Sequence, residues 1–325
     1  MTDNGDHSNI TLLDAKSLRV VWSSVRIPYE LTHLEFVSQD FGFLAAVWAN
    51  PIVFKDIAVS SQASLVQVRY NSTFDVLIDK IPGRVTSLAV TPDRQLVAVC
   101  SEAQGKEDAT CRVFRLSDRK LLWTWSPTYC QRLSVVFTND SQQCFLATQE
   151  SHHLESARAP PAKNDTGMRV FLVSANNGTL LQREEWNDSR SLGHQPFLAG
   201  SSTDPEAFAL FHREIRKVTF QNNGFVSETL LSTNGLNALH AYPVRIDFNP
   251  KCGFLPFAST GDHREGHQPS IWFLNRDNGS VSDRRVFRYD LSSFRISPDG
   301  KLLYVLHPGG EGIYSEVSIY DLQNL

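Results

Sequence analysis

The chain has 325 residues, of which 20% are charged, and its formal net charge is −4. Neutralising the phosphates of a nucleic acid requires a basic stripe, which this sequence lacks, so we expect no nucleic-acid partner. The longest apolar run, around Phe41 to Phe54, is interrupted by Asn50 and Pro51 and is shorter than the roughly 20 residues that span a bilayer, so we expect no membrane span.

The N-terminal residues Thr2 to Asp6 are polar and acidic, unlike a signal peptide, in which a basic segment precedes an apolar one. Seven Asn-x-Ser/Thr triplets nevertheless occur, and such triplets accept N-linked glycans in secreted proteins. They begin at Asn9, Asn71, Asn139, Asn164, Asn177, Asn187 and Asn278. We therefore expect a protein of the secretory pathway whose leader is absent from this sequence, with a cytoplasmic protein as the alternative.

Short apolar segments rich in Val, Phe, Leu and Ile alternate with turn residues along the chain, which is typical of an all-β protein. A first set of turns comprises Ser38-Gln39-Asp40, Thr91-Pro92-Asp93, Thr138-Asn139-Asp140, Ser202-Thr203-Asp204, Asn249-Pro250-Lys251 and Ser297-Pro298-Asp299-Gly300. Their third positions are separated by 53, 47, 64, 47 and 48 residues. Periods of about 40 to 50 residues with four strands each are typical of propeller blades.

A second set of turns lies later in each period and carries the Asn and Gly residues that tight hairpins favour. It comprises Asp14-Ala15-Lys16-Ser17, Asn71-Ser72-Thr73, Ser117-Asp118-Arg119, Asn176-Asn177-Gly178, Asn222-Asn223-Gly224 and Asp277-Asn278-Gly279. Each period therefore reads as strand a, first turn, strand b, variable loop, strand c, second turn and strand d. In the second period we expect these strands at Val85–Val90, Leu96–Cys100, Arg112–Leu116 and Lys120–Trp125.

The last period offers three strands, at Ser293–Ile296, Leu302–Leu306 and Glu316–Tyr320. The N-terminal segment Ile10–Trp22 can supply the fourth strand by an exchange between the chain ends. The sequence therefore predicts a single domain over residues 1–325, an all-β propeller of six four-stranded blades whose ring is closed by the N-terminal strand. Seven blades are the alternative.

The segment Ser297-Pro298-Asp299-Gly300-Lys301-Leu302-Leu303-Tyr304-Val305, followed by Val317-Ser318-Ile319-Tyr320-Asp321-Leu322, resembles the blade consensus of WD-repeat and lactonase-type propellers. The resemblance implies the fold over most of the chain. It implies no particular activity, because one fold hosts many functions.

In a propeller the b-to-c loops and the d-to-a connections open on one face, and here they contain eight of the ten histidines. Loops on a rigid scaffold are where binding residues are expected. The candidate catalytic residues are His263, His267, Arg264 and Tyr314, and the candidate substrate-binding residues are Trp48, Tyr129, His153 and His307. His263 and His267 are four residues apart in a Gly-containing loop rather than on a helix, so we predict neither a metal site nor a cofactor.

Two kinds of modification are expected. Four of the triplets, at Asn71, Asn139, Asn177 and Asn278, fall on the opposite face, that of the short turns, and are predicted to be glycosylated. Cys100 and Cys111 flank a ten-residue polar loop between two strands, where a disulfide would close the hairpin. Buried thiols are the alternative for these two residues.

The size of the chain, its triplets, its five cysteines and its lack of standard catalytic motifs are similar to those of a group of fungal natural-product enzymes, the hetero-Diels–Alderases. The resemblance implies a cofactor-free cycloaddition between two apolar small molecules, a tropolone-derived quinone methide and a humulene-type terpene. Holding the partners in a reactive geometry contributes about 7 kcal/mol or more to such a reaction. Trp48, Tyr129 and Tyr314 would hold the terpene, while His263, His267 or Arg264 would donate protons.

Two other functions remain open. A propeller that binds a protein or peptide would present a broad face with exposed aromatic anchors. A lactonase-like hydrolase would need oxygen ligands around a divalent cation, for which the innermost strands offer Glu35 and Asp247 but no repeated carboxylate pattern.

Overall fold

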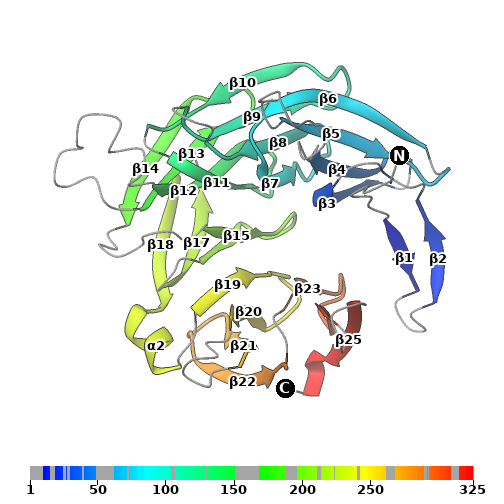
Figure 1. The fold of residues 1–325 in the computed structure, drawn as a ribbon. Coiled ribbons are helices and arrows are strands. Elements are labelled where there is room, and N and C mark those ends of the chain that lie inside the picture. The colour runs from blue at the N-terminus through cyan, green and yellow to red at the C-terminus, as the bar shows by residue number, and fades with distance from the viewer. Residues whose placement is uncertain are drawn as a thin grey trace, which may run out of the picture. The chain divides into compact units, whose positions relative to one another are not determined.

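The computed structural model describes residues 10–14, 19–24, 27, 30–38, 40–48, 62–71, 73–103, 107–128, 130–150, 168–186, 196–210, 214–222, 224–239, 242–260, 268–288, 291, 293–308 and 315–324. Within these residues, successive strands pair antiparallel in chain order, and their sheets are the six blades of a β-propeller (Figure 1). No helix among them is long and apolar enough to cross a membrane, since α2 (Thr233–Ala238) has six residues.

Five of the sheets follow the predicted a, b, c, d order, and the sixth contains strands a, b and c. The first three blades are β3 (Glu30–Ser38), β4 (Gly42–Trp48), β5 (Gln62–Val68) and β6 (Phe74–Pro82); β7 (Val85–Val90), β8 (Leu96–Ser101), β9 (Thr110–Arg115) and β10 (Leu121–Trp125); and β11 (Cys130–Phe137), β12 (Gln143–Glu150), β13 (Met168–Ser174) and β14 (Leu180–Trp186). The last three are β15 (Phe197–Gly200), β16 (Glu206–Leu210), β17 (Ile215–Gln221) and β18 (Gly224–Leu231); β19 (Tyr242–Ile246), β20 (Phe254–Thr260), β21 (Ser270–Asn275) and β22 (Val281–Val286); and β23 (Ser293–Ile296), β24 (Leu302–Pro308) and β25 (Ser315–Asp321).

The all-β propeller fold predicted from the repeats is confirmed. In the second blade, the four expected strands agree with β7 to β10 to within two residues at each end. The first turns lie between strands a and b, and five of the six second turns lie between strands c and d, whereas the one that begins at Asp14 lies between β1 (Thr11–Leu13) and β2 (Val20–Ser23). The turn residues specify this arrangement because their side chains bind the local backbone. Thr91 Oγ1, for example, accepts hydrogen bonds from the amides of Gln95 and Leu96 at 3.2 and 3.0 Å.

The N-terminal segment differs from the expectation. β1 (Thr11–Leu13) and β2 (Val20–Ser23) pair with each other in a two-stranded sheet, and the sheet of β23 to β25 contains three strands. The amide of Asp14 donates to the carbonyl of Arg19 at 2.8 Å, which closes a hairpin within the segment. A short loop costs little entropy to close, so local pairing satisfies these strands. Among the sheets of the described residues, the predicted strand exchange with the last blade does not occur.

The chain divides into two compact units, and the first comprises Met1–Val135, Glu150–Pro160 and Ala175–Gly178. Strand b of its first blade, β4, is apolar on both faces because each face packs against another sheet. Leu44 and Leu65 belong to the cluster shared with Val97 of β8. On the other face, Phe43 contacts Trp22 of the β1–β2 hairpin, with ring centroids 6.1 Å apart. The hairpin therefore shields a face of the first blade from water.

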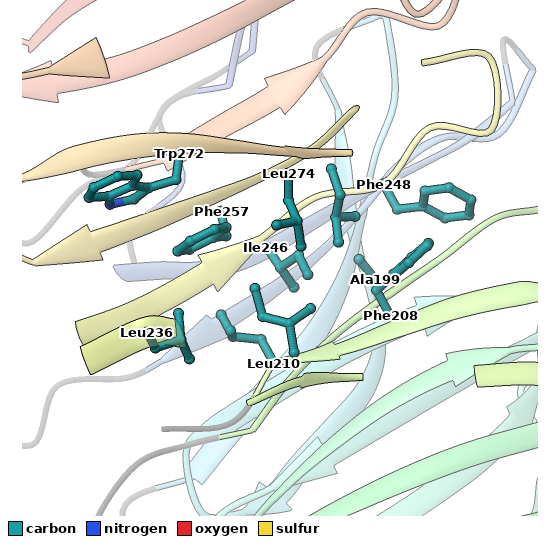
Figure 2. Close-up of a cluster of buried hydrophobic side chains, with 11 residues drawn as sticks. Ala199, Phe208, Leu210, Leu236, Ile246, Phe248, Phe257, Trp272 and Leu274 are labelled. Carbon is teal, nitrogen blue, oxygen red and sulfur yellow. The ribbon is translucent and has the colours of Figure 1, made fainter. Parts of the chain in front are cut away.

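The second unit comprises Val136–Gln149, Pro161–Ser174 and Thr179–Leu325. Figure 2 shows how the fourth and fifth blades pack, with Phe208 and Leu210 of β16 near Ile246 of β19 and Phe257 of β20. All four side chains are at most 4% exposed, and burying a large apolar side chain contributes about 1.5–3 kcal/mol. The fifth and sixth blades pack in the same way, through Phe273 and other residues of their central strands. This packing fixes the inner strands β19 and β23, which carry the candidate site.

Candidate functional site

Most of the side chains predicted to act on a ligand lie outside the described residues. These are His263, His267, Arg264, Tyr314, Tyr129 and His153. His307 lies in β24, opposite Glu316 of β25. Trp48 ends β4, is half-buried and packs against the apolar cluster of the first two blades, so its ring takes part in blade packing.

The predicted glycosylation sites lie in turns. Asn71, Asn177 and Asn278 are exposed, and Asn139 is half-buried. The Oδ1 atoms of Asn71 and Asn278 accept hydrogen bonds from the hydroxyl groups two residues later, at 2.7 and 2.8 Å. Glycosylation at these sites stays a prediction.

The structure brings together one cluster of charged residues, on the inner strands of the fifth and sixth blades. Asp247 directly follows β19, and its residue is only 7% exposed. Its Oδ1 accepts a hydrogen bond from Nη1 of Arg295 at 2.8 Å, and its Oδ2 accepts one from the amide of Ile296, also at 2.8 Å. Asp247 therefore binds to β23 through both carboxylate oxygens and links the two blades.

A second guanidinium group lies beside this pair. Arg245 is located on β19, two residues before Asp247, and alternate residues of a strand share a face. Burial lowers the pKa of Arg245, the positive charge of Arg295 lowers it further, and the negative charge of Asp247 partly opposes both effects. Within the described residues, the cluster thus holds two cations around one carboxylate.

Linking adjacent blades does not in itself require this charge. Between the second and third blades, the neutral hydroxyl of Ser87 on β7 accepts a hydrogen bond from the amide of Val135 on β11 at 3.2 Å. The hydroxyl of Thr86 donates to the carbonyl of Leu133 at 2.8 Å. Neutral groups therefore suffice for the same kind of contact between inner strands. A link between adjacent blades therefore does not require the three charged side chains of Arg245, Asp247 and Arg295.

The cluster suits an anion better than a cation. Both oxygens of Asp247 already accept hydrogen bonds, and two guanidinium groups repel a metal ion. Among the described residues, no group of three or more His, Cys, Asp or Glu side chains is arranged to hold a metal. Arg295, whose side chain is 60% exposed, is accessible to a ligand in solvent, and guanidinium groups bind carboxylates and phosphates in a bidentate fashion.

The sequence interpretation missed both arginines and considered Asp247 only as a cation ligand. A usable signal was present, because Arg245, Asp247 and Arg295 interrupt the apolar segments of two inner strands. Charged residues in such positions are uncommon and need partners. The residues predicted from the sequence lie instead in or next to the histidine-rich loops, most of which fall outside the described residues.

Comparison with known proteins adds information on the fold. No family model matches the chain, and no curated protein matches its sequence. Among solved structures, it is similar to a protein of unknown function from Desulfotomaculum acetoxidans, with a TM-score of 0.62 and 13% identity over 97% of this chain and 89% of that one. It is also similar to the hydrazine synthase of Kuenenia stuttgartiensis, with a TM-score of 0.63 and 12% identity over 97% of this chain and 90% of that one. At such low identity these similarities establish the propeller fold alone.

Proposed function

We propose that the protein is a binding propeller that holds a carboxylate-bearing ligand, such as an acidic peptide, at Arg245 and Arg295. The observation that carries this proposal is the pair of guanidinium groups beside Asp247 on the inner strands of two adjacent blades, one of them well exposed to solvent. Asp247 fixes the Arg295 guanidinium through its Oδ1 atom, so less side-chain entropy is lost when a ligand binds. The packed strands β19 and β23 thus support a pre-oriented cation.

The proposal predicts that Arg295→Gln weakens the binding of a fluorescent hexaglutamate peptide at least tenfold, measured by fluorescence anisotropy at low salt. Glutamine retains an amide N–H that can donate to Asp247 but lacks the charge that attracts the peptide. Raising the salt concentration weakens binding to the unmodified protein, because exposed charges are screened beyond about 10 Å at 0.1 M. Titration with inorganic phosphate distinguishes a general oxyanion site, where phosphate competes, from one selective for carboxylates.

Arg285→Gln is the matched control, because Arg285 pairs with Asp283 on β22 of the same unit at 3.0 Å. We expect this variant to bind the peptide within twofold of the unmodified protein. Equal affinities of the Arg295 variant and the unmodified protein, or no binding to either, would contradict the proposal. Thermal unfolding of each variant verifies that the fold is retained.

The resemblance to fungal hetero-Diels–Alderases supports a second proposal, a secreted enzyme of terpenoid metabolism that joins a tropolone quinone methide to a humulene-type terpene. Its support comes from the sequence, namely the histidine-bearing loops and the lack of standard catalytic motifs. Such a cycloaddition needs positioning and a few proton donors rather than a covalent nucleophile.

This second proposal predicts one stereoisomer of the adduct when the protein is incubated with both precursors, as followed by chiral chromatography and mass spectrometry. Replacement of His263 and His267 by alanine should lower the rate at least tenfold, because a positioned acid or base contributes about 10²-fold or more. A racemic adduct, or product formation no faster than in buffer, would rule out this activity. The remaining alternative, a lactonase-like hydrolase, predicts hydrolysis of a lactone that EDTA abolishes, because such an enzyme needs its divalent cation.

A further inference from the structure

Two cysteines face each other in the second blade. The register of β8 and β9 places Cys100 directly opposite Cys111, and both residues are fully buried. The binding function proposed above uses neither of them. Neither residue forms a disulfide in the structure, so the bond predicted between them from the sequence is not observed there. The question is whether the backbone geometry allows a bond between their sulfur atoms.

The answer depends on which opposed residues of β8 and β9 are hydrogen-bonded to each other. The amide of Leu116 donates to the carbonyl of Gln95 at 2.8 Å, so this opposed pair is hydrogen-bonded. Bonded and non-bonded pairs alternate along antiparallel strands. The Cys100–Cys111 pair lies five steps further along the ladder and is therefore a non-hydrogen-bonded pair.

The hydrogen bonds between β9 and β10 lead to the same conclusion. The amide of Arg115 donates to the carbonyl of Lys120, toward β10. Amides point alternately to the two sides of a strand, so the amide of Cys111 also points toward β10 and away from β8. In a non-hydrogen-bonded pair the Cα atoms approach to about 4.5 Å, which lies within the range of roughly 4.4–6.8 Å that disulfides span.

Arg112 directly follows Cys111 on β9, and successive side chains of a strand point to opposite faces, so the Arg112 side chain lies on the other face of the sheet from the two thiols. The Arg112 guanidinium interacts electrostatically with both Cys111 and Cys100. Its Nη1 donates to the hydroxyl groups of Thr110 and Ser101 at 2.5 and 3.2 Å, which holds the side chain in place. The thiolate is the form that attacks a disulfide, and exchange also requires access to the sulfur, so oxidation proceeds through local opening of the second blade, which exposes the two buried thiols.

We infer that Cys100 and Cys111 are a reversible oxidation site, at which a low-molecular-weight disulfide such as oxidised glutathione forms a cross-strand disulfide within the second blade. One thiolate attacks a glutathione sulfur and releases the first glutathione thiolate. The second cysteine, after losing its proton, attacks the resulting mixed disulfide and releases the second. The protein loses two electrons and two protons, and oxidised glutathione takes them up as two molecules of the thiol.

The test equilibrates the full chain with reduced or oxidised glutathione, traps thiols with N-ethylmaleimide under denaturing conditions, and maps the digest by mass spectrometry. We expect a linked pair of peptides containing Cys100 and Cys111 after oxidation, and its loss after reduction. Oxidation should also raise Tm by about 5 °C, because the bridge constrains the unfolded chain.

Variants distinguish this pair from the other cysteines. Cys111→Ala abolishes the oxidation-dependent rise in Tm, whereas Cys252→Ala, which removes a buried cysteine of the second unit, retains it. The inference is overturned if both cysteines are fully alkylated after oxidation while the denatured chain forms disulfides under the same oxidant. A linked peptide that joins Cys111 to Cys130 instead of Cys100 overturns it equally. Peptide binding at Arg295 is measured separately, so either proposal can fail alone.

Discussion

Replacing Trp123 with alanine lowers the free energy of unfolding by about 4 kcal/mol. Trp123 lies on β10, is 8% exposed, and its indole Nε1 donates to the carbonyl of Ala175 at 2.8 Å. Its ring also packs directly on Gly178, where an added Cβ would lie 2.9 Å from Cδ2. The variant opens a cavity against the second turn of the third blade and leaves a buried carbonyl without its donor.

Urea denaturation followed by circular dichroism measures this loss. Trp123→Phe retains most of the apolar volume but lacks the N–H group, so we expect a smaller loss of about 1–2 kcal/mol. Leu121→Ala on the same strand is the matched control, because Leu121 is 45% exposed and its truncation should cost under about 1 kcal/mol. Similar losses for Trp123→Ala and Leu121→Ala would show that the contact does not stabilise the blades.

Replacing Asp247 with alanine lowers the free energy of unfolding by about 3 kcal/mol. The variant removes the acceptor of two hydrogen bonds of 2.8 Å, leaves the amide of Ile296 without that acceptor, and places Arg245 beside Arg295 without the intervening negative charge. Exposure of the Arg295 side chain keeps the loss below that of a fully buried ion pair. Thermal and urea unfolding both measure the effect.

Two further variants test how much the negative charge of Asp247 contributes to stability and to peptide binding. Asp247→Asn retains an acceptor for the amide of Ile296 but removes the charge, so the stability loss falls to about 1 kcal/mol and the acidic peptide binds several-fold more tightly. Asp283→Ala removes the exposed partner of Arg285 on β22 and should cost at most about 1 kcal/mol. If Asp247→Asn bound the peptide more weakly than the unmodified protein, the loss of the hydrogen bond that orients Arg295 would outweigh the removal of the negative charge.

The sequence predicted the blades well because the determinants of a blade are local. In Thr91-Pro92-Asp93 and Ser297-Pro298-Asp299-Gly300, side-chain hydroxyl and carboxylate groups bind amides a few residues away. Such turns can be recognised in one period of the repeat without knowledge of the others. Strand b is largely apolar in most blades because both of its faces are buried, which is also visible in the sequence.

The N-terminal hairpin shows where local reasoning was incomplete. The tight turn that begins at Asp14 was recognised as a hairpin signal, and β1 pairs with β2 across it. The predicted exchange between the chain ends nevertheless assigned one strand of this hairpin to the last blade, the sheet of β23 to β25. Trp22 settles the placement in the first unit, because its Nε1 donates to the carbonyl of Tyr70 at 2.7 Å and its ring contacts Phe43.

By itself, the sequence determined that this chain forms a propeller of short strands and favoured six blades over seven, because turn residues and apolar runs act over a few residues and recur in each period. Only the tertiary structure decided which polar residues come together. Asp247 and Arg295 are 48 residues apart, and their contact depends on how one blade packs against the next. The same holds for Trp123 and Ala175, 52 residues apart, because contacts between blades depend on side-chain packing that no single repeat encodes.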